Sequence, residues 1–123
     1  MSRINNTLRF FKVTGELRKD KCEFTIDPWK LLLETQRYYE IRPESGAVKR
    51  IYKEKLNTTV IETKQYANGT LCCSAFCTED RIEDLQRLIL NHLQTSVKTY
   101  MEDLKLNLMA LSRYTSSLEP LHK

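Results

Sequence analysis

The stretch TEDRIEDLQRLILNHLQTSVKTYMEDLKLNLMALSRYTSSL, residues 78–118, is the longest periodic segment of this 123-residue chain. Its first turn is rich in acidic residues, which favour the positive end of a helix dipole and mark a helix start at Thr78 or Asp80. Apolar side chains then recur at a mean spacing of about 3.6 residues, the period of a straight α-helix. They are Ile82, Leu85, Ile89, Leu93, Val97, Tyr100, Leu104, Leu108, Leu111 and Leu118, with Thr115 as the polar position in the series. The segment predicts a helical region with one apolar stripe.

The length of this region conflicts with a compact domain. No Gly or Pro interrupts it before Pro120, and a helix of ~40 residues would be ~60 Å long. A compact domain of this size has a radius of gyration of only ~14 Å. Either the helix breaks near residues 94–96 and forms a helical hairpin on its own sheet, or it stays single and meets another protein.

From Val97 onward the apolar stripe approaches the heptad seam of a coiled coil. Both alternatives bury the stripe, but its apolar surface exceeds what one small sheet needs to cover. We therefore predict a protein interface in this part of the helical region. Its residues are Val97, Tyr100, Leu104, Leu108 and Leu111.

Two β-hairpins are predicted before the helical region. The first joins TLRFFKV (7–13) to CEFTI (22–26), and its loop lies between residues 14 and 21 with a turn at Thr14-Gly15.

The second hairpin joins TTVIETKQY (58–66) to TLCCSAFC (70–77). Asn68-Gly69 forms its turn, because both residues readily adopt the positive φ that a tight hairpin requires. The strand 70–77 is nearly all small and apolar, so we expect it to be buried on both faces.

Between the hairpins, Asp27-Pro28 predicts the start of a helix that continues to Ile41. Asp can cap free amides, and Pro at the first helical position loses no hydrogen bond that the helix needs. Pro43 prevents further extension. The segment AVKRIYKEKL (47–56) fits a helix or a strand, and the spacing of its apolar residues favours the helix.

The predicted fold class is α+β. An antiparallel sheet of about four strands comes from the two hairpins, one or two helices lie between them, and a long C-terminal helix or helical hairpin packs across the sheet. We expect a single domain over residues 1–123, with a mixed β-hairpin and helix portion at 1–77 and the long helical region at 78–118.

Composition indicates a globular protein, with 41% apolar and 29% charged residues and only three Gly and three Pro. No apolar run is long enough to cross a bilayer, so no membrane partner is expected. The cysteines, Cys22, Cys72, Cys73 and Cys77, follow no secretory signal and are read as reduced thiols. The predicted localisation is intracellular, in the cytoplasm or nucleus.

Candidate catalytic and metal sites are weak. Cys72 and Cys73 would point to opposite faces of a strand and cannot act as a pair of metal ligands. Nothing in the sequence places a nucleophile beside His92, and three glycines cannot build a phosphate-binding loop. We predict no enzyme activity, no metal and no cofactor.

A basic and aromatic belt at residues 37–55 supports a different function. Residues 1–55 hold 13 of the 20 basic side chains and 8 of the 16 acidic ones. Lys and Arg can neutralise phosphates, and exposed Tyr can stack on unpaired bases. The candidate nucleic-acid-binding residues are Arg37, Arg42, Lys49, Arg50, Tyr52, Lys53 and Lys55. Glu40, Glu44 and Glu54 lower the net positive charge of this segment. The alternative is therefore that its tyrosines are half-buried and its basic residues form a solvated rim around them.

The sequence thus predicts a non-catalytic interaction or assembly subunit. Its C-terminal helix would form a homo-oligomer or dock onto a larger complex. The alternative is an RNA-binding protein that uses the belt at residues 37–55. The two functions are compatible, because a dimer would double the positive surface.

Overall fold

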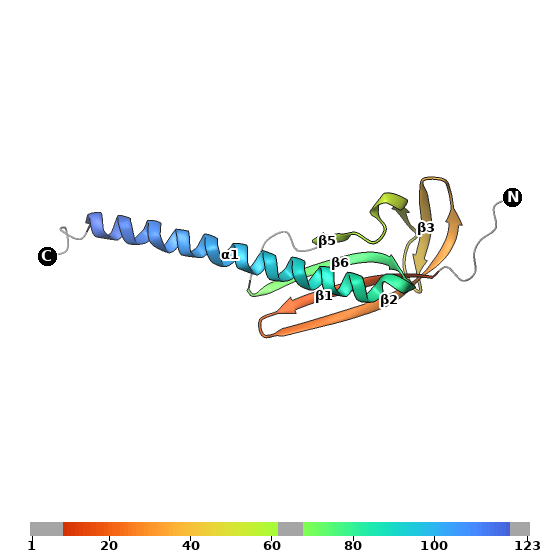
Figure 1. The fold of residues 1–123 in the computed structure, drawn as a ribbon, viewed down its shortest axis with the longest axis horizontal. Coiled ribbons are helices and arrows are strands. Elements are labelled where there is room, and N and C mark those ends of the chain that lie inside the picture. The colour runs from red at the N-terminus through yellow and green to blue at the C-terminus, as the bar shows by residue number, and fades with distance from the viewer. Residues whose placement is uncertain (1–8, 62–67, 119–123) are drawn as a thin grey trace. The chain divides into compact units, whose positions relative to one another are not determined.

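The computed structural model describes residues 9–61 and 68–118 (Figure 1). The elements are β1 (Phe10–Arg18), β2 (Lys21–Glu34), β3 (Tyr38–Pro43), β4 (Lys49–Tyr52), η1 (Lys53–Lys55), β5 (Thr59–Ile61), β6 (Thr70–Thr78), η2 (Glu79–Arg81) and α1 (Ile82–Leu118). The chain divides into two compact units, the first ending at Leu93 and the second beginning at Gln94.

The first unit is built on a curled antiparallel sheet in the order β4-β3-β2-β1-β6-β5 (Figure 1). The prediction of about four strands with one or two intervening helices is therefore wrong: the described residues form six strands. The additional strand structure comes from the region between the two expected hairpins. The strands β2 and β1 are the centre of the sheet, and β1 pairs with both β2 and β6 along its whole length.

The helix expected from Asp27-Pro28 is replaced by the second half of β2 and by β3. Strand β2 pairs with β1 as far as Trp29 and with β3 from Trp29 onward, so backbone groups on both sides find partners in strands. On the β3 side Pro28 lies just before the ladder begins, where a strand tolerates a residue without an N–H. The ring of Trp29 packs edge-on against Phe76, with 4.9 Å between ring centroids. The non-local contact outweighs the local signal for a helix start.

The helix favoured for residues 47–56 is also wrong. Lys49–Tyr52 form strand β4 beside β3, and a single 3-10 turn follows at Lys53–Lys55. Ile51 is buried against Phe10 and Ile41, whereas Arg50 and Tyr52 are exposed. Such alternation has the period of two that a strand requires.

The first hairpin forms, but its turn lies further along the chain than expected. Strands β1 and β2 are joined by the two residues Lys19 and Asp20, and Lys19 has a positive φ of 54°. Gly15, expected in the turn, lies within β1 opposite Phe24. Residues 7 and 8 of the expected strand lie outside the described part of the chain.

The second hairpin pairs Thr59–Ile61 of β5 with residues 73–75 of β6. Asn68 and Gly69 have the expected positive φ values of 54° and 70°. Ser74 and Ala75 point to opposite faces of β6 and are both buried, which confirms the two-sided burial predicted there. Residues 62–66 of the expected first strand lie outside the described residues.

The helix α1 runs without interruption from Ile82 to Leu118, so the alternative with a break near residues 94–96 is wrong. In the first unit, Leu85, Ile89 and Leu93 are buried at a spacing of four residues, as the stripe predicted. A Cβ atom added at Gly15 would lie 2.5 Å from Cγ2 of Ile89. The helix therefore covers the face of the sheet that carries Gly15. No helix in residues 9–61 and 68–118 is long and apolar enough to cross a membrane.

The opposite face of the sheet has a core of its own. It consists of buried Phe10, Ile41 and Ile51, with Trp29, Leu31, Tyr39, Leu56 and Phe76 packed against them. Because adjacent residues in a strand alternate between faces, Phe10 and Phe11 are both buried, one in each core.

The β6 cysteines on the helix-covered face are shielded. Cys73 and Cys77 are fully buried, while Cys22 on β2 is exposed. Burial raises the pKa of the Cys77 thiol to about 11, with Asp80 adding to the effect and Arg81 opposing it. The thiol of Cys77 is therefore protonated at neutral pH and unreactive.

Gly15→Ala tests the contact between β1 and α1. The added methyl group meets Ile89 and the ring of Phe24, so we expect a loss of about 1–3 kcal/mol in the free energy of unfolding. Urea denaturation measures this loss. In an Ile89→Ala background the methyl group has room, and Gly15→Ala should then cost much less. Equal costs in both backgrounds would contradict the contact.

Candidate interaction surfaces

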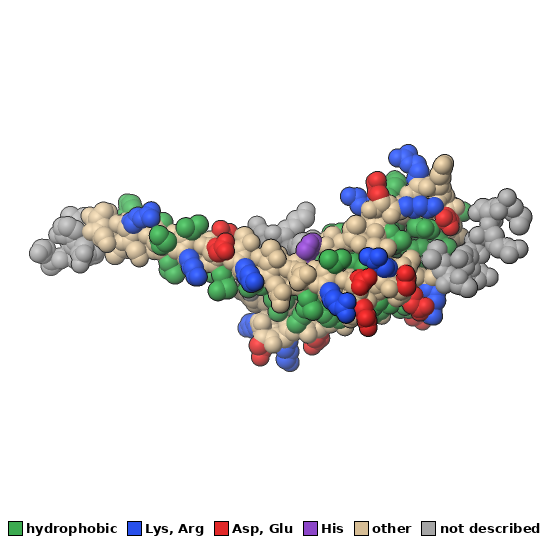
Figure 2. Space-filling view, viewed as in Figure 1, with side chains coloured by type: hydrophobic (Ala, Val, Ile, Leu, Met, Phe, Trp, Pro, Cys, Tyr) green, Lys and Arg blue, Asp and Glu red, His purple; other side chains and the backbone are tan. Residues whose placement is uncertain are grey.

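The second unit, in its described residues Gln94–Leu118, consists only of the C-terminal part of α1. Its large apolar side chains are 37–68% exposed, and hydrophobic surface is visible along the helix in Figure 2. They are Tyr100, Met101, Leu104, Leu106, Leu108, Met109, Leu111, Tyr114 and Leu118. A single helix cannot bury its own side chains, so within residues 101–118 these apolar side chains stay largely exposed.

The predicted interface residues lie on one side of this helix. We define the helix stripe as Val97, Tyr100, Leu104, Leu108, Leu111 and Leu118. At ~100° per residue they fall within about a quarter of the helix circumference. Val97 is half-buried and the others are exposed. Met101 and Tyr114 flank the helix stripe on its two sides, and Leu106 and Met109 lie on the other side of the helix.

Sequence reasoning missed Tyr114, which at 68% is the most exposed of these side chains. The signal was its position seven residues after Asn107 and fourteen after Tyr100. This is the heptad spacing of a coiled-coil seam.

The cations of the basic belt are partly neutralised by residues on neighbouring strands. Arg50 on β4 lies opposite Glu40 on β3, and its Nε donates to the Glu40 carboxylate at 3.2 Å. Its guanidinium carbon is also 4.8 Å from the centroid of the Tyr38 ring. Tyr38 and Tyr52 pack edge to face across the same two strands. Arg50 is thus held on the β3–β4 hairpin by an ion pair and a ring contact, and its charge is partly neutralised.

Lys53 is the most firmly held member of the belt. Its ammonium group donates to Glu34 at 2.7 Å and lies 5.1 Å from the centroid of the Tyr39 ring. The hydrogen bond to Glu34 raises the pKa of Lys53, a shift that desolvation partly opposes. Lys53 is therefore engaged within the sheet.

The remaining belt residues do not form one surface. Arg42 shares a strand face with Tyr38 and Arg50, because β3 residues at even positions pair with Arg50 and Tyr52. Lys49 lies on the opposite face, 5.5 Å from the ring centroid of Phe76. Arg37 and Lys55 are exposed and lie outside the strands. The structure brings Arg42, Arg50 and Tyr52 together and separates Lys49 and Lys53 from them.

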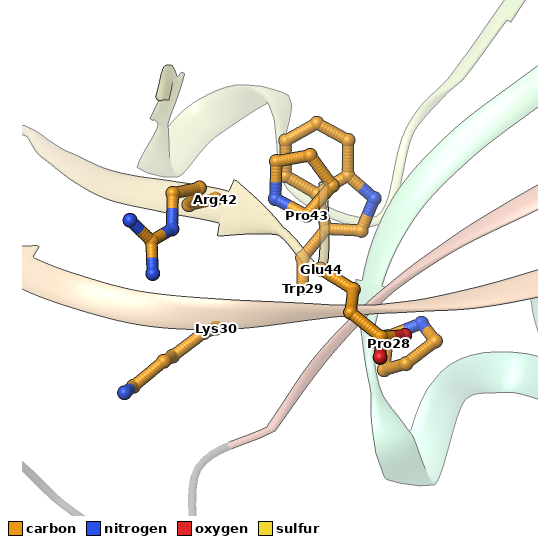
Figure 3. A pocket seen from close by; sticks show the side chains of 6 residues that line it. All are labelled: Pro28, Trp29, Lys30, Arg42, Pro43 and Glu44. Atoms are coloured by element: carbon orange, nitrogen blue, oxygen red, sulfur yellow. The ribbon is translucent and has the colours of Figure 1, made fainter. Parts of the chain in front are cut away.

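A pocket of about 360 Å³ opens where β2 and β3 meet (Figure 3). It is lined by Pro28, Trp29, Lys30, Arg42, Pro43 and Glu44. Lys30 and Arg42 lie directly opposite each other on paired strands, and both are exposed. In Figure 3 their side chains point to the same side, away from Glu44. Two like charges in this position repel each other.

His92 has neighbours that the sequence did not reveal. Its Nδ1 lies 2.9 Å from the hydroxyl oxygen of Thr59 and 4.0 Å from the sulfur of Cys73. A thiol beside an imidazole is a nucleophile arrangement, but Cys73 is fully buried beneath the helix. Substrate cannot reach a sulfur atom in that position, so the contact is one of packing between α1, β5 and β6.

The surfaces of residues 9–61 and 68–118 therefore offer the helix stripe, the face of β3–β4 and the pocket. Within these residues no group of three or more His, Cys, Asp or Glu side chains could hold a metal ion. Comparison of the chain with protein-family models, with curated proteins and with solved structures finds no match.

Proposed function

We propose that this protein is a non-catalytic assembly subunit that binds protein through the helix stripe, by self-association or by docking onto a larger complex. One observation carries the proposal: residues 94–118 of the second unit form a single helix with large exposed apolar side chains. Contiguous apolar surface of this kind in a folded protein marks an interaction site.

The size of the surface supports the proposal. A whole Leu, Met or Tyr side chain has roughly 200 Å² of surface. The exposed fractions of the helix stripe, Met101 and Tyr114 then amount to several hundred Å². Stable protein interfaces bury about 800 Å² per partner, so the helix alone offers an area of the right order.

The division of the chain into two units also supports it. The sheet and the first turns of α1 enclose two cores, although Ile26, Leu33 and Val60 stay exposed. From Leu104 onward the side chains of the helix stripe are 39–65% exposed, which suits a surface that binds a partner.

We place the subunit in a reducing intracellular compartment, the cytoplasm or nucleus. The support is the burial of Cys73 and Cys77 and the high pKa of Cys77, which suit thiols that remain reduced.

Leu104→Glu with Leu108→Glu tests the helix stripe. Burying two carboxylates per chain in an apolar interface is costly, so we expect self-association to weaken by at least ~100-fold. Light scattering on a size-exclusion column, run at two protein concentrations, measures the mass. The parent chain should form an oligomer and the double variant a monomer.

Leu106→Glu with Met109→Glu is the matched control. It adds the same charges to exposed apolar positions on the other side of the helix. We expect its mass to equal that of the parent. Equal disruption by both pairs, or a parent that is monomeric at both concentrations, would count against self-association through the helix stripe.

The second candidate function is binding of single-stranded RNA by the face of β3–β4. The observation in its favour is that Arg42, Arg50 and Tyr52 lie together and exposed on one strand face. The ion pairs of Arg50 with Glu40 and of Lys53 with Glu34 weaken it, because both cations already have partners.

Arg42→Gln with Arg50→Gln tests this alternative, because both cations lie on the proposed face. For an RNA-binding face we expect affinity for single-stranded RNA to fall at least tenfold, and the slope of log K against log salt to flatten by about 1. Fluorescence anisotropy at several salt concentrations measures both. Glu40→Gln releases Arg50 from its ion pair and should strengthen binding. If neither change alters the affinity, the face of β3–β4 does not bind RNA.

A further inference from the structure

Four members of the helix stripe follow a strict heptad in the second unit, and Asn107 and Tyr114 lie along the same edge of the stripe as Tyr100. Val97, Leu104, Leu111 and Leu118 recur every seven residues, and Tyr100, Asn107 and Tyr114 recur every seven residues three positions later. These two series are the a and d positions of a coiled coil. Asn107 is therefore a polar residue in the middle of an otherwise apolar or aromatic seam.

We propose that the partner on the helix stripe is a second copy of this chain, aligned parallel and in register, with Asn107 of the two copies facing each other. The inference rests on the proposed function and deepens it by naming the partner and its orientation. Its basis is the position of Asn107 between Leu104 and Leu111.

A buried amide must find a hydrogen-bond partner, because leaving it unsatisfied costs about 1–3 kcal/mol. In a parallel pair each d residue faces the same residue of the other copy, so the amide N–H of one Asn107 donates to the amide oxygen of the other. An unrelated apolar helix would offer no such partner. The identical chain supplies one by symmetry.

An antiparallel pair does not satisfy this residue. There the a positions of one helix lie opposite the d positions of the other, so Asn107 would face Leu104 or Leu111 of the second copy. Both amides would then be buried against apolar side chains. A single polar residue at an a position specifies register and oligomeric state in coiled coils, and we expect Asn107, at a d position, to set the orientation by the same kind of pairing.

The positions that flank the seam do not oppose self-pairing. On one flank lie Met101, Leu108 and Thr115, and on the other Ser96, Asp103, Ala110 and Ser117. In a parallel pair a residue on the second flank meets the residue five positions later on the other copy, which places Asp103 beside Leu108. No like charges therefore face each other, and the charged Lys98, Glu102, Lys105 and Arg113 lie away from the seam.

Cysteine cross-linking tests the orientation in the full chain. A Cys22→Ser background removes the exposed thiol on β2, and Tyr100→Cys or Leu118→Cys is added singly. We expect each variant alone to form a disulfide-linked dimer under mild oxidation, seen by non-reducing electrophoresis, and the background alone to form none. An antiparallel pair would self-link neither variant. With Asn107 opposite Leu111, residue 100 lies near residue 118 of the other copy and a mixture of the two variants links; with Asn107 opposite Leu104, residue 100 lies near residue 111, and a mixture of Tyr100→Cys with Leu111→Cys links.

Light scattering on the same samples distinguishes a failure of the parallel arrangement from a failure of self-association itself. An oligomer without self-linking at residues 100 and 118 would overturn the parallel arrangement and leave the proposed function standing. A monomer at every concentration would overturn both.

Asn107→Leu tests the role of the amide. We expect dimerisation to tighten at least tenfold, and links between residues 100 and 118 to appear in the mixture as the orientation becomes mixed. Ser116→Leu, which adds the same side chain away from the seam, should change neither result. If Asn107→Leu also leaves both unchanged, Asn107 does not set the orientation and the inference fails.

Discussion

The contact between Gly15 and Ile89 is the constraint on which the first unit depends. A side chain at position 15 would separate α1 from the sheet, and without one the helix can lie directly on β1. Strand β1 is hydrogen-bonded to β2 and β6 along its whole length, so this contact ties the helix to three adjacent strands. Leu85, Ile89 and Leu93 are the buried residues of α1. The large apolar residues of the same helix from Met101 to Leu118 are exposed.

The periodicity of the long helix could be read from the sequence because it is a local property. A spacing of about 3.6 residues and an acidic first turn are sufficient to identify α1 and the helix stripe. The strands β3 and β4 could not be found in this way. Asp27-Pro28 is compatible with a helix start and with a strand, and the contact that decides between them joins Trp29 to Phe76, far apart in the sequence. A local sequence pattern does not show which residues far apart in the chain will contact each other.

The candidate sites show the same distinction. The helix stripe was predicted residue by residue, because neighbours on a helix are three or four residues apart. The basic belt was identified by its cations, but not by the carboxylates that neutralise them. Glu34 pairs with Lys53 and Glu40 with Arg50 only after β2, β3 and β4 have assembled. Composition along the chain therefore overestimated the positive charge that the folded surface offers.

The ladder between β1 and β6 has a consequence during synthesis. Phe10 pairs with Thr78 and Arg18 with Thr70, so roughly 60 residues separate partners in the chain. At ~5–20 residues per second, β1 waits several seconds for β6 to be made. The edge of β1 that later pairs with β6 has no partner strand during that interval, and an unpaired strand edge can pair with another chain and aggregate. Lys12, Glu16 and Arg18 interrupt the apolar residues of β1 with charges of both signs. Such charges oppose edge-to-edge pairing of nascent chains until the proper partner strand arrives.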